Sequence, residues 1–312
     1  MTPCLLSMPG NERTTAVIAR ELACESASID LHRFPDGESS LRTAAELAGR
    51  DVAIVCTLDH PDDKLAALLF AADLARDLGA TSVGLLAPYL AYMRQDMRFH
   101  RGESVTAKYF AGLISTSFDW LVTVDPHLHR FPSLESIYSI QTVAVRAAPA
   151  IGAWIRQHVK DPGLIGPDAE SKQWVSEVAR HADAPFLVLD KARSGDQSVA
   201  VSVPAAPWLK HCTPVIVDDI ASTARTLIAA IRAIIAAGGA KPVCIVVHGL
   251  FAGSAHADLN AAGVAQVVSC NTVAHESNAI TLDPELTTAT AQVFKLMAAH
   301  RKNLGSPNAV EK

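Results

Sequence analysis

The sequence has no excess of basic residues and no basic tail, which argues against a nucleic-acid partner. Its 27 Lys and Arg residues are outnumbered by 32 Asp and Glu residues, so the formal net charge is −5 at neutral pH. Proteins that bind nucleic acid draw much of their affinity from positive charge set against phosphates. We therefore expect small-molecule partners and no nucleic acid.

The sequence also lacks a long apolar run and any close pair of cysteines. No apolar segment approaches the length of a membrane span, and the N-terminus has no basic region followed by an apolar core. The six cysteines are scattered, with no C-x-x-C pair. Buried free thiols in a reducing compartment are the simplest account of them. These absences predict a soluble, cytoplasmic protein with no membrane partner.

Aromatic residues make up only 5% of the chain, whereas apolar residues as a whole reach 49%. Ala, Val, Ile and Leu dominate, a composition typical of helices packed on buried parallel strands. A chain of 312 residues exceeds one typical core, so two domains are expected. Strand-like and helix-like segments alternate in both halves. We predict an α/β fold with a mainly parallel sheet, flanked by helices, in each domain.

Residues 130–148 show weak periodicity, and the domain boundary is placed there. The first domain is predicted over residues 1–147 and the second over residues 148–312. The last helix, from Pro284 to about Asn303, is expected to pack on the first domain. The shared rhythm of strand, loop and helix is compatible with an internal duplication.

The most informative stretch is VIVDDIASTART, at residues 215–226. Its apolar strand brings Asp218 and Asp219 to the C-terminal tip, where open α/β sheets bind ligands. The loop Ile220–Thr226 then offers hydroxyl and backbone N–H groups at the start of a helix, which suit a phosphate monoester. The carboxylates suit the hydroxyls of a vicinal diol. The stretch predicts a sugar-phosphate site; the alternative is that the two aspartates only cap the helix.

Two polar segments in the first half carry further candidate ligand groups. The turn Arg33–Glu38 presents the ring of Phe34 beside two acids, a combination that can stack on a nucleobase and accept its amino hydrogens; an ordinary turn is the alternative. The loop Pro88–Glu103 gathers Arg and His side chains, which are costly to cluster without a shared anion. A solvated basic turn is the alternative there.

A candidate metal site follows the predicted strand Trp120–Asp125. Asp125, His127 and His129 alternate at the end of this strand, so their side chains can face one cleft. Zinc would need a further close ligand in a recognisable frame, and the sequence shows none. A hard cation shared with substrate phosphates needs fewer protein ligands. The pattern favours Mg²⁺ over zinc, with histidines that bind no metal as the alternative.

The second half contains a polar segment, Asp190–Gln197, that carries Lys191 and Arg193. Such a loop can close over an anionic ligand. An ordinary hairpin connection to a strand at residues 198–203 is the alternative. An earlier strand of this half ends in Gly-Pro-Asp168, which places another carboxylate at a strand end.

Taken together, these segments resemble the ribose-phosphate pyrophosphokinase family, also called phosphoribosyl pyrophosphate synthetases. Each segment alone is weak evidence, but they follow the family's order along nearly the whole chain. The matching segments are FPDGE at 34–38, PYLAYMRQD at 88–96, VTAK at 105–108, VDPH at 124–127, GPD at 166–168, DKAR at 190–193 and VDDIASTART at 217–226. The resemblance implies two tandem phosphoribosyltransferase-like domains with the active site between them.

The resemblance also implies a role for each matching position. The ATP-binding positions are Phe34, Asp36, Glu38, Arg94, Gln95 and Asp96. The ribose 5-phosphate positions are Asp218, Asp219, Ser222, Thr223, Arg225 and Thr226. His127 and Asp168 match positions that engage Mg²⁺, and Lys191 and Arg193 match the catalytic loop. Because the adenine turn of the family serves a neighbouring subunit, a homo-oligomer of at least two chains is implied.

The implied reaction transfers the pyrophosphoryl group of MgATP to O1 of ribose 5-phosphate, giving phosphoribosyl pyrophosphate and AMP. Such a transfer depends on positioning and on neutralisation of charge, which Lys191, Arg193 and Mg²⁺ would provide. No residue stands out as a general base. Two alternatives remain: a phosphoribosyltransferase that consumes the activated sugar, and a catalytically silent regulatory paralogue.

The chain departs from the family pattern at three places. Asp168 is followed by Ala-Glu-Ser where the family commonly has glycines, and Arg225 stands where the phosphate loop commonly has glycine. If the backbone at Arg225 needs a positive φ, the side chain strains it; otherwise its guanidinium could bind the 5-phosphate. The stretch Arg101–Ser104 lacks the pattern tied to control by phosphate and nucleotide. The nucleotide donor and allosteric control are therefore left open.

Overall fold

The computed structural model describes residues 2–194, 198–204 and 206–304, which form two α/β units. Unit 1 comprises Met1–Val145 and Asp283–Lys312, and unit 2 comprises Arg146–Leu282. The last helix, α8 (Asp283–Leu304), thus belongs to unit 1 although unit 2 precedes it in the sequence. Each unit is built around one six-stranded sheet.

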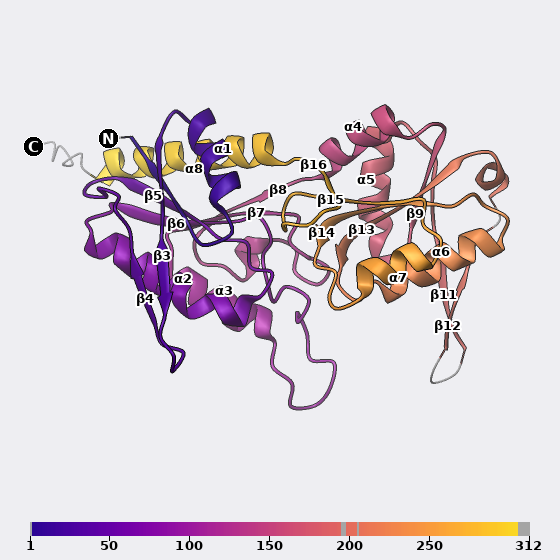
Figure 1. The fold of residues 1–312 in the computed structure, drawn as a ribbon, viewed down its shortest axis with the longest axis horizontal. Coiled ribbons are helices and arrows are strands. Elements are labelled where there is room, and N and C mark those ends of the chain that lie inside the picture. The colour runs from indigo at the N-terminus through magenta and orange to yellow at the C-terminus, as the bar shows by residue number, and fades with distance from the viewer. Residues whose placement is uncertain (1, 195–197, 205, 305–312) are drawn as a thin grey trace, which may run out of the picture. The chain divides into compact units, whose positions relative to one another are not determined.

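The sheet of unit 1 is entirely parallel, in the order β2-β1-β5-β6-β7-β8. Its strands are β1 (Cys4–Ser7), β2 (Glu25–Ser28), β5 (Asp51–Val55), β6 (Ser82–Ala87), β7 (Trp120–Val124) and β8 (Gln141–Val145). Helices α1 (Glu12–Glu21) and α8 cover one face, and α2 (Pro61–Asp77) and α3 (Thr106–Ser117) cover the other (Figure 1). Because both faces are covered, the central strands β5, β6 and β7 are uninterrupted runs of buried residues.

Helix α8 is fixed to unit 1 by an aromatic contact and an ion pair. The rings of Phe294 on α8 and Trp120 on β7 meet edge to face, with centroids 5.5 Å apart. Arg301 Nη2 donates a hydrogen bond of 2.6 Å to Oδ2 of Asp51 at the start of β5. A Cβ at Gly84 on β6 would lie 1.9 Å from Cε2 of Trp120, so only glycine allows the indole its place in this core.

The sheet of unit 2 is also parallel, in the order β10-β9-β13-β14-β15-β16. Its strands are β9 (Pro162–Gly166), β10 (Phe186–Val188), β13 (Thr213–Ala221), β14 (Val243–Gly249), β15 (Gln266–Cys270) and β16 (Asn278–Ile280). Its helices are α4 (Ala148–His158), α5 (Lys172–Ala182), α6 (Arg225–Ala236) and α7 (Ala255–Ala261). In Figure 1, α4 and α5 cover one face of this sheet, and α6 and α7 cover the other. The described residues also form three short 3-10 turns: η1 (Leu134–Ser136), η2 (Ala169–Ser171) and η3 (Pro207–Lys210).

Each unit carries a two-stranded antiparallel ribbon inserted after the second strand of its sheet. In unit 1 the ribbon is β3 (Asp30–Arg33) with β4 (Ser39–Arg42), and in unit 2 it is β11 (Asp190–Ser194) with β12 (Ser198–Ser202). Both ribbons project from their sheets in Figure 1. The two units therefore share strand order and the place of their insertion, as an internal duplication would produce.

The predicted α/β fold with a mainly parallel sheet in each of two domains is confirmed. The weakly periodic region 130–148 nevertheless contains β8, which the sequence did not reveal. This strand lies at the edge of its sheet, and exposed and buried residues alternate irregularly along it, so it lacks the buried run that marks the central strands. Among the described residues, none of the helices combines the length and the apolar character needed to cross a membrane.

Candidate active site

Three carboxylates lie at the switch point of the sheet of unit 2, between β9 and β13. The chain leaves these neighbouring strands toward opposite edges of the sheet, since β9 leads to β10 and β13 leads to β14. Open α/β sheets bind ligands in the crevice that such a divergence leaves at the carboxyl ends of the strands. Asp168 follows β9, and Asp218 and Asp219 lie on β13 beyond its last pairing with β9, which joins Ile216 to Ile165. The acids therefore occupy the position where this fold accepts ligands.

Asp168 shapes the segment that follows β9. Its Oδ1 accepts hydrogen bonds from the backbone N–H groups of Glu170 (3.2 Å) and Ser171 (3.3 Å), and so caps the turn η2. The hydroxyl of Ser171 donates to the Asp168 carbonyl at 2.6 Å. A Cβ at Gly166 would lie 2.4 Å from this hydroxyl, so the glycine is needed for the close approach. The Ala-Glu-Ser sequence that follows Asp168 thus forms an ordered turn.

The strand carrying the acid pair is longer than predicted. The sequence placed the start of the phosphate loop at Ile220, but β13 continues to Ala221, and Ile220 and Ala221 pair with β14. The reason lies in the segment after β14. The Ala221 carbonyl accepts hydrogen bonds from the N–H groups of Leu250 (3.0 Å) and Phe251 (2.9 Å). These long-range bonds hold the last residues of β13 extended, which a local pattern cannot indicate.

The loop itself is reduced to Ser222–Ala224, and α6 begins at Arg225. Ala224 adopts the left-handed conformation, with φ 55° and ψ 12°, whereas Arg225 is not among the residues with positive φ. The backbone strain considered for Arg225 therefore falls one residue earlier. Thr223 and Arg225 are exposed, so a hydroxyl and a guanidinium flank the start of a helix, where N–H groups and the helix dipole favour an anion.

Lys191 and Arg193 lie on a hairpin. The sequence predicted a polar loop over Asp190–Gln197, but residues 190–194 form β11, paired with β12 through Lys191 to Val201 and Arg193 to Val199. The alternating Val-Ala-Val of β12 explains the pairing, because β-branched residues favour strands. The hairpin alternative is correct for this part of the segment, and residues 195–197 lie outside the described ranges.

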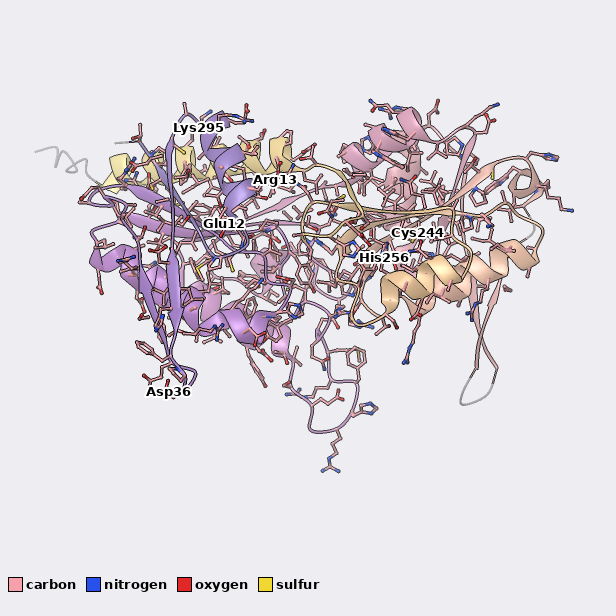
Figure 2. The ribbon with its side chains drawn as sticks, in the orientation of Figure 1. Glu12, Arg13, Asp36, Cys244, His256 and Lys295 are labelled. Atoms are coloured by element: carbon pink, nitrogen blue, oxygen red, sulfur yellow. The ribbon has the colours of Figure 1, made fainter. Side chains whose placement is uncertain are left out.

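In unit 1, the predicted adenine turn is the tip of the β3–β4 ribbon. The turn is closed by hydrogen bonds from Phe34 N–H to the Glu38 carbonyl (2.8 Å) and from Gly37 N–H to the Phe34 carbonyl (2.9 Å). Gly37 has φ 95°, which suits glycine, and the Glu38 N–H donates to Asp36 Oδ1 at 3.2 Å. Phe34 is 44% exposed, and Figure 2 shows Asp36 at the end of the ribbon. The tip therefore presents a ring and two acids on an ordered turn.

The Arg94-Gln95-Asp96 segment is less uniform than the sequence suggested. Arg94 is exposed, but the side chain of Asp96 is fully buried, and both of its oxygens accept hydrogen bonds from Arg130 Nη1, at 3.0 and 3.1 Å. Asp96 thus anchors the loop within unit 1. Arg130 was missed because its partner is 34 residues away and no local pattern signals the pair.

Part of the basic cluster in this loop has an internal partner. Glu103 Oε2 accepts hydrogen bonds from the backbone N–H groups of Phe99 (2.8 Å) and His100 (2.9 Å), and Arg98 Nε donates to the Glu103 carbonyl at 3.0 Å. Arg94 and Arg101 are exposed cations of the same loop. The loop is therefore held in shape by Glu103 while it presents positive charge to solvent.

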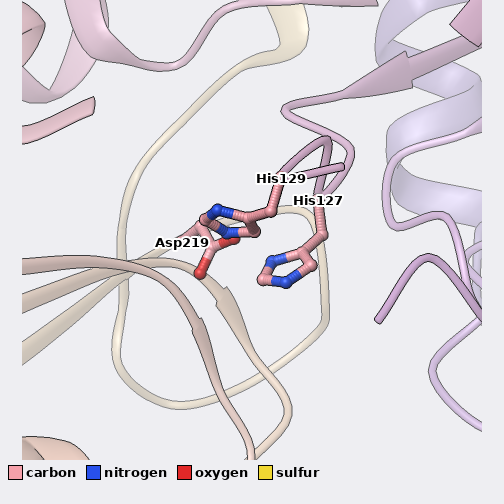
Figure 3. A group of neighbouring side chains, drawn as sticks. All are labelled: His127, His129 and Asp219. Atoms are coloured by element: carbon pink, nitrogen blue, oxygen red, sulfur yellow. The ribbon is translucent and has the colours of Figure 1, made fainter. Parts of the chain in front are cut away.

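The two histidines after β7 lie side by side. The ring centroids of His127 and His129 are 3.9 Å apart, and Figure 3 shows both rings projecting from this loop. Asp125 is buried, has φ 29° and donates its N–H to the Val145 carbonyl at 2.9 Å. The structure therefore brings His127 and His129 together at the surface of unit 1 and places Asp125 inside. Asp219, also labelled in Figure 3, belongs to unit 2.

Comparisons with known families match both units. Residues 4–117 match the N-terminal domain of ribose phosphate pyrophosphokinase, and residues 133–285 match the phosphoribosyl transferase domain. Ribose-phosphate pyrophosphokinase of Saccharolobus solfataricus is 31% identical over 272 residues, which are 85% of this chain and 92% of the relative. The protein of that name from Methanopyrus kandleri is 30% identical over 87% of this chain and 93% of its own length.

Solved structures agree on the fold. Phosphoribosylpyrophosphate synthetase from Mycobacterium smegmatis superposes with a TM-score of 0.82, over 94% of this chain and 99% of the other, at 20% sequence identity. The high score over nearly the full length of both chains shows that the arrangement of strands and helices is shared.

Proposed function

We propose that this chain, which belongs to the ribose-phosphate pyrophosphokinase family, transfers the pyrophosphoryl group of ATP to the O1 hydroxyl of ribose 5-phosphate. The products are phosphoribosyl pyrophosphate and AMP. The observation that carries the proposal is the acid pair Asp218 and Asp219 near the end of β13, a strand that is separated from the start of α6 by only the three residues 222–224. No other described strand end joins adjacent carboxylates to a short hydroxylated loop and a helix start.

Unit 2 binds the acceptor in this proposal. The carboxylates of Asp218 and Asp219 accept hydrogen bonds from the ribose hydroxyls, which are donors of the kind that carboxylates require. The 5-phosphate lies at the start of α6, where Ser222, Thr223 and Thr226 supply hydroxyls. Arg225, exposed and without a positive φ, contributes a guanidinium to the same phosphate.

Unit 1 binds the donor. The half-exposed ring of Phe34 stacks on the adenine, while Asp36 and Glu38 accept hydrogen bonds from its amino group. Arg94 and Gln95 bind the phosphates, and Asp96 keeps their loop in place through Arg130. We further propose that the ribbon tip serves the ATP of a neighbouring copy, so that the active enzyme is at least a homodimer. We also propose that the reaction takes place in the cytoplasm, a proposal supported by the scattered cysteines without a close pair.

The transfer forms a bond from O1 of the ribose to the β-phosphorus as the bond from that phosphorus to the α-phosphate oxygen breaks. AMP leaves with the electron pair, and the O1 proton passes to solvent. Lys191 and Arg193 on β11 neutralise the charge that develops on the transferred group, which is the main requirement of phosphoryl chemistry. No side chain is assigned as a general base.

The donor set fits Mg²⁺. Asp168 would hold the ion through its carboxylate, the ligand type that Mg²⁺ prefers. The part of His127 rests on the family resemblance alone, and its imidazole would hydrogen-bond to water bound to an ion. When bound with ATP, the ion supplies positive charge to the phosphates. The hairpin cations then need to neutralise only what develops during the transfer.

The direct test follows ATP and ribose 5-phosphate by ³¹P NMR after a quench. We expect equal amounts of AMP and phosphoribosyl pyrophosphate, and ADP as the nucleotide product would contradict the proposal. Conversion of added phosphoribosyl pyrophosphate and a free base to a nucleotide would instead show a phosphoribosyltransferase. Lys191→Ala should lose turnover, whereas Lys210→Ala, an exposed lysine on η3, should keep it.

A further inference from the structure

A cluster of two histidines and a glutamate lies in unit 2, outside the residues assigned to the reaction. His256 is in the first turn of α7, and His275 and Glu276 are in the loop between β15 and β16. Figure 2 shows His256 beside α7. We propose that His256, His275 and Glu276 bind a divalent transition-metal ion, of which Zn²⁺ is the best match.

The geometry of the three side chains is close to that of a metal site. One ligand atom of each residue lies within 4.8 Å of the others. Ligands at about 2.0–2.1 Å in a tetrahedral site are separated by roughly 3.4 Å, so modest side-chain rotations close the site. Two imidazoles and a carboxylate are a common ligand set for zinc, with the fourth position left to water. Mg²⁺ prefers oxygen ligands, so it competes poorly here.

The surroundings orient the two rings. Phe251 lies against both, with its centroid 4.5 Å from that of His275 and 5.3 Å from that of His256. The two imidazoles meet edge to face with centroids 4.7 Å apart. His275 Nδ1 accepts a hydrogen bond of 3.1 Å from the Ser277 backbone N–H and lies 2.8 Å from the Ser277 hydroxyl, and these contacts hold the ring in place.

The arrangement of the three side chains favours a metal ion over a simple ion pair. A salt bridge between His256 and Glu276, whose nearest atoms are 3.1 Å apart, accounts for two of the three residues. The ring of His275, whose centroid lies 4.7 Å from that of His256, takes no part in that pair, whereas a metal ion held by all three side chains accounts for each of them.

An ion bound at the cluster would affect the loop that binds ribose 5-phosphate, because the two are connected by backbone hydrogen bonds. This step rests on the proposed function. Phe251 donates its backbone N–H to the Ala221 carbonyl, and the Ala252 N–H donates to the Ser222 carbonyl at 3.0 Å. An ion that joins α7 to the β15–β16 loop stiffens the segment on which the ribose 5-phosphate loop rests. We expect the metal to lower the KM for ribose 5-phosphate while it leaves the ATP KM unchanged.

The test uses the full-length protein, stripped with a chelator and kept in excess Mg²⁺, and titrates Co²⁺ as a spectroscopic probe. We expect the visible absorption of a tetrahedral complex with nitrogen and oxygen ligands, abolished by one equivalent of Zn²⁺. His256→Gln and His275→Gln should weaken Co²⁺ binding by at least roughly ten- to a hundredfold, because even the loss of a hydrogen-bond partner of a metal ligand costs that much. Glu276→Gln should weaken it too, and this side chain is 77% exposed, so the variant should fold normally.

The matched control is His158→Gln. His158 is exposed at the end of α4 and stacks on Trp154, and α4 covers the opposite face of the sheet from α7 (Figure 1). The proposal is overturned if the three cluster variants bind Co²⁺ with the affinity and spectrum of the control. The titration requires no turnover, so a protein that binds the ion but makes no AMP would refute the proposed function and leave the metal site standing.

Discussion

The two sheets have the same strand order but use their switch points differently. In unit 2 the divergence between β9 and β13 carries Asp168, Asp218 and Asp219. In unit 1 the equivalent divergence lies between β1 and β5, and Asn11 bridges it: its Oδ1 accepts a hydrogen bond of 2.8 Å from the Thr57 N–H. One scaffold thus has three carboxylates at this point, and the other has an internal polar bridge.

The bridge in unit 1 uses both donors and one of the two acceptor positions of one amide. Asn11 Nδ2 donates to the carbonyls of Met8 and Pro9, both at 3.3 Å, and the side chain is buried. Its groups are therefore committed to the backbone of the strand ends. The candidate ligand groups of unit 1 lie instead on the ribbon tip and on the loops after β6 and β7. The comparison indicates that function follows the side chains at the strand ends and not the fold alone.

The largest expected effect comes from removing the charge at the switch point of unit 2. Asp218→Asn with Asp219→Asn should lower kcat/KM for ribose 5-phosphate by about 10²–10⁴-fold, because each hydrogen bond to a charged group contributes roughly 1.5–3 kcal/mol. Steady-state rates with varied ribose 5-phosphate measure this, with Asp258→Asn on α7 as the matched control. If the double variant has the same kcat/KM as the parent, the charge of the two acids is not needed, and the proposed difference between the two switch points is wrong.

The second-largest effect is expected at the ion pair between Asp96 and Arg130 in unit 1. Arg130→Met should lower the free energy of unfolding by about 3 kcal/mol, because the buried carboxylate of Asp96 loses its charged partner. Adding Asp96→Asn should restore part of that loss, since the neutral amide costs less to bury. Denaturant unfolding of both variants measures the difference. Equal stability of Arg130→Met and the parent would show that the loop is held by other contacts.

A smaller effect is expected at the bridge of unit 1. Asn11→Ala should lower the free energy of unfolding by about 2 kcal/mol, because it leaves the Thr57 N–H without its 2.8 Å acceptor near the strand ends. The KM for ribose 5-phosphate should not change, since the bridge lies in the other unit from the acceptor groups. Thermal unfolding and the same rate assay give the two readings. A KM shift as large as that of the aspartate variants would mean that both switch points serve the substrate.

The buried strands and the acid pair could be predicted from the sequence, because each is marked by a pattern of neighbouring residues. Buried strands such as β6 follow from a continuous apolar run, and the acid pair of β13 stands directly after one. The true end of β13 was not readable, because the bonds of Leu250 and Phe251 to Ala221 set it from nearly thirty residues away. The Asp96–Arg130 pair was missed for the same reason. Asp96 is buried only once the loop has folded, so the spacing of residues in the sequence cannot predict its pairing with Arg130.

The smallest effect concerns the backbone of the phosphate loop, where the family's glycine is absent. Ala224 carries the positive φ of 55°, so Ala224→Gly should stabilise the protein by about 1 kcal/mol, while Arg225→Gly should destabilise α6 by a similar amount because its φ is ordinary. Thermal unfolding of the two variants measures opposite shifts.

If Arg225 also binds the 5-phosphate, Arg225→Gly should raise the KM for ribose 5-phosphate, and Arg225→Lys should raise it less because the lysine keeps the positive charge. Opposite shifts in stability with no change in KM would confine Arg225 to the helix and leave the hydroxyls and N–H groups of the loop to hold the phosphate.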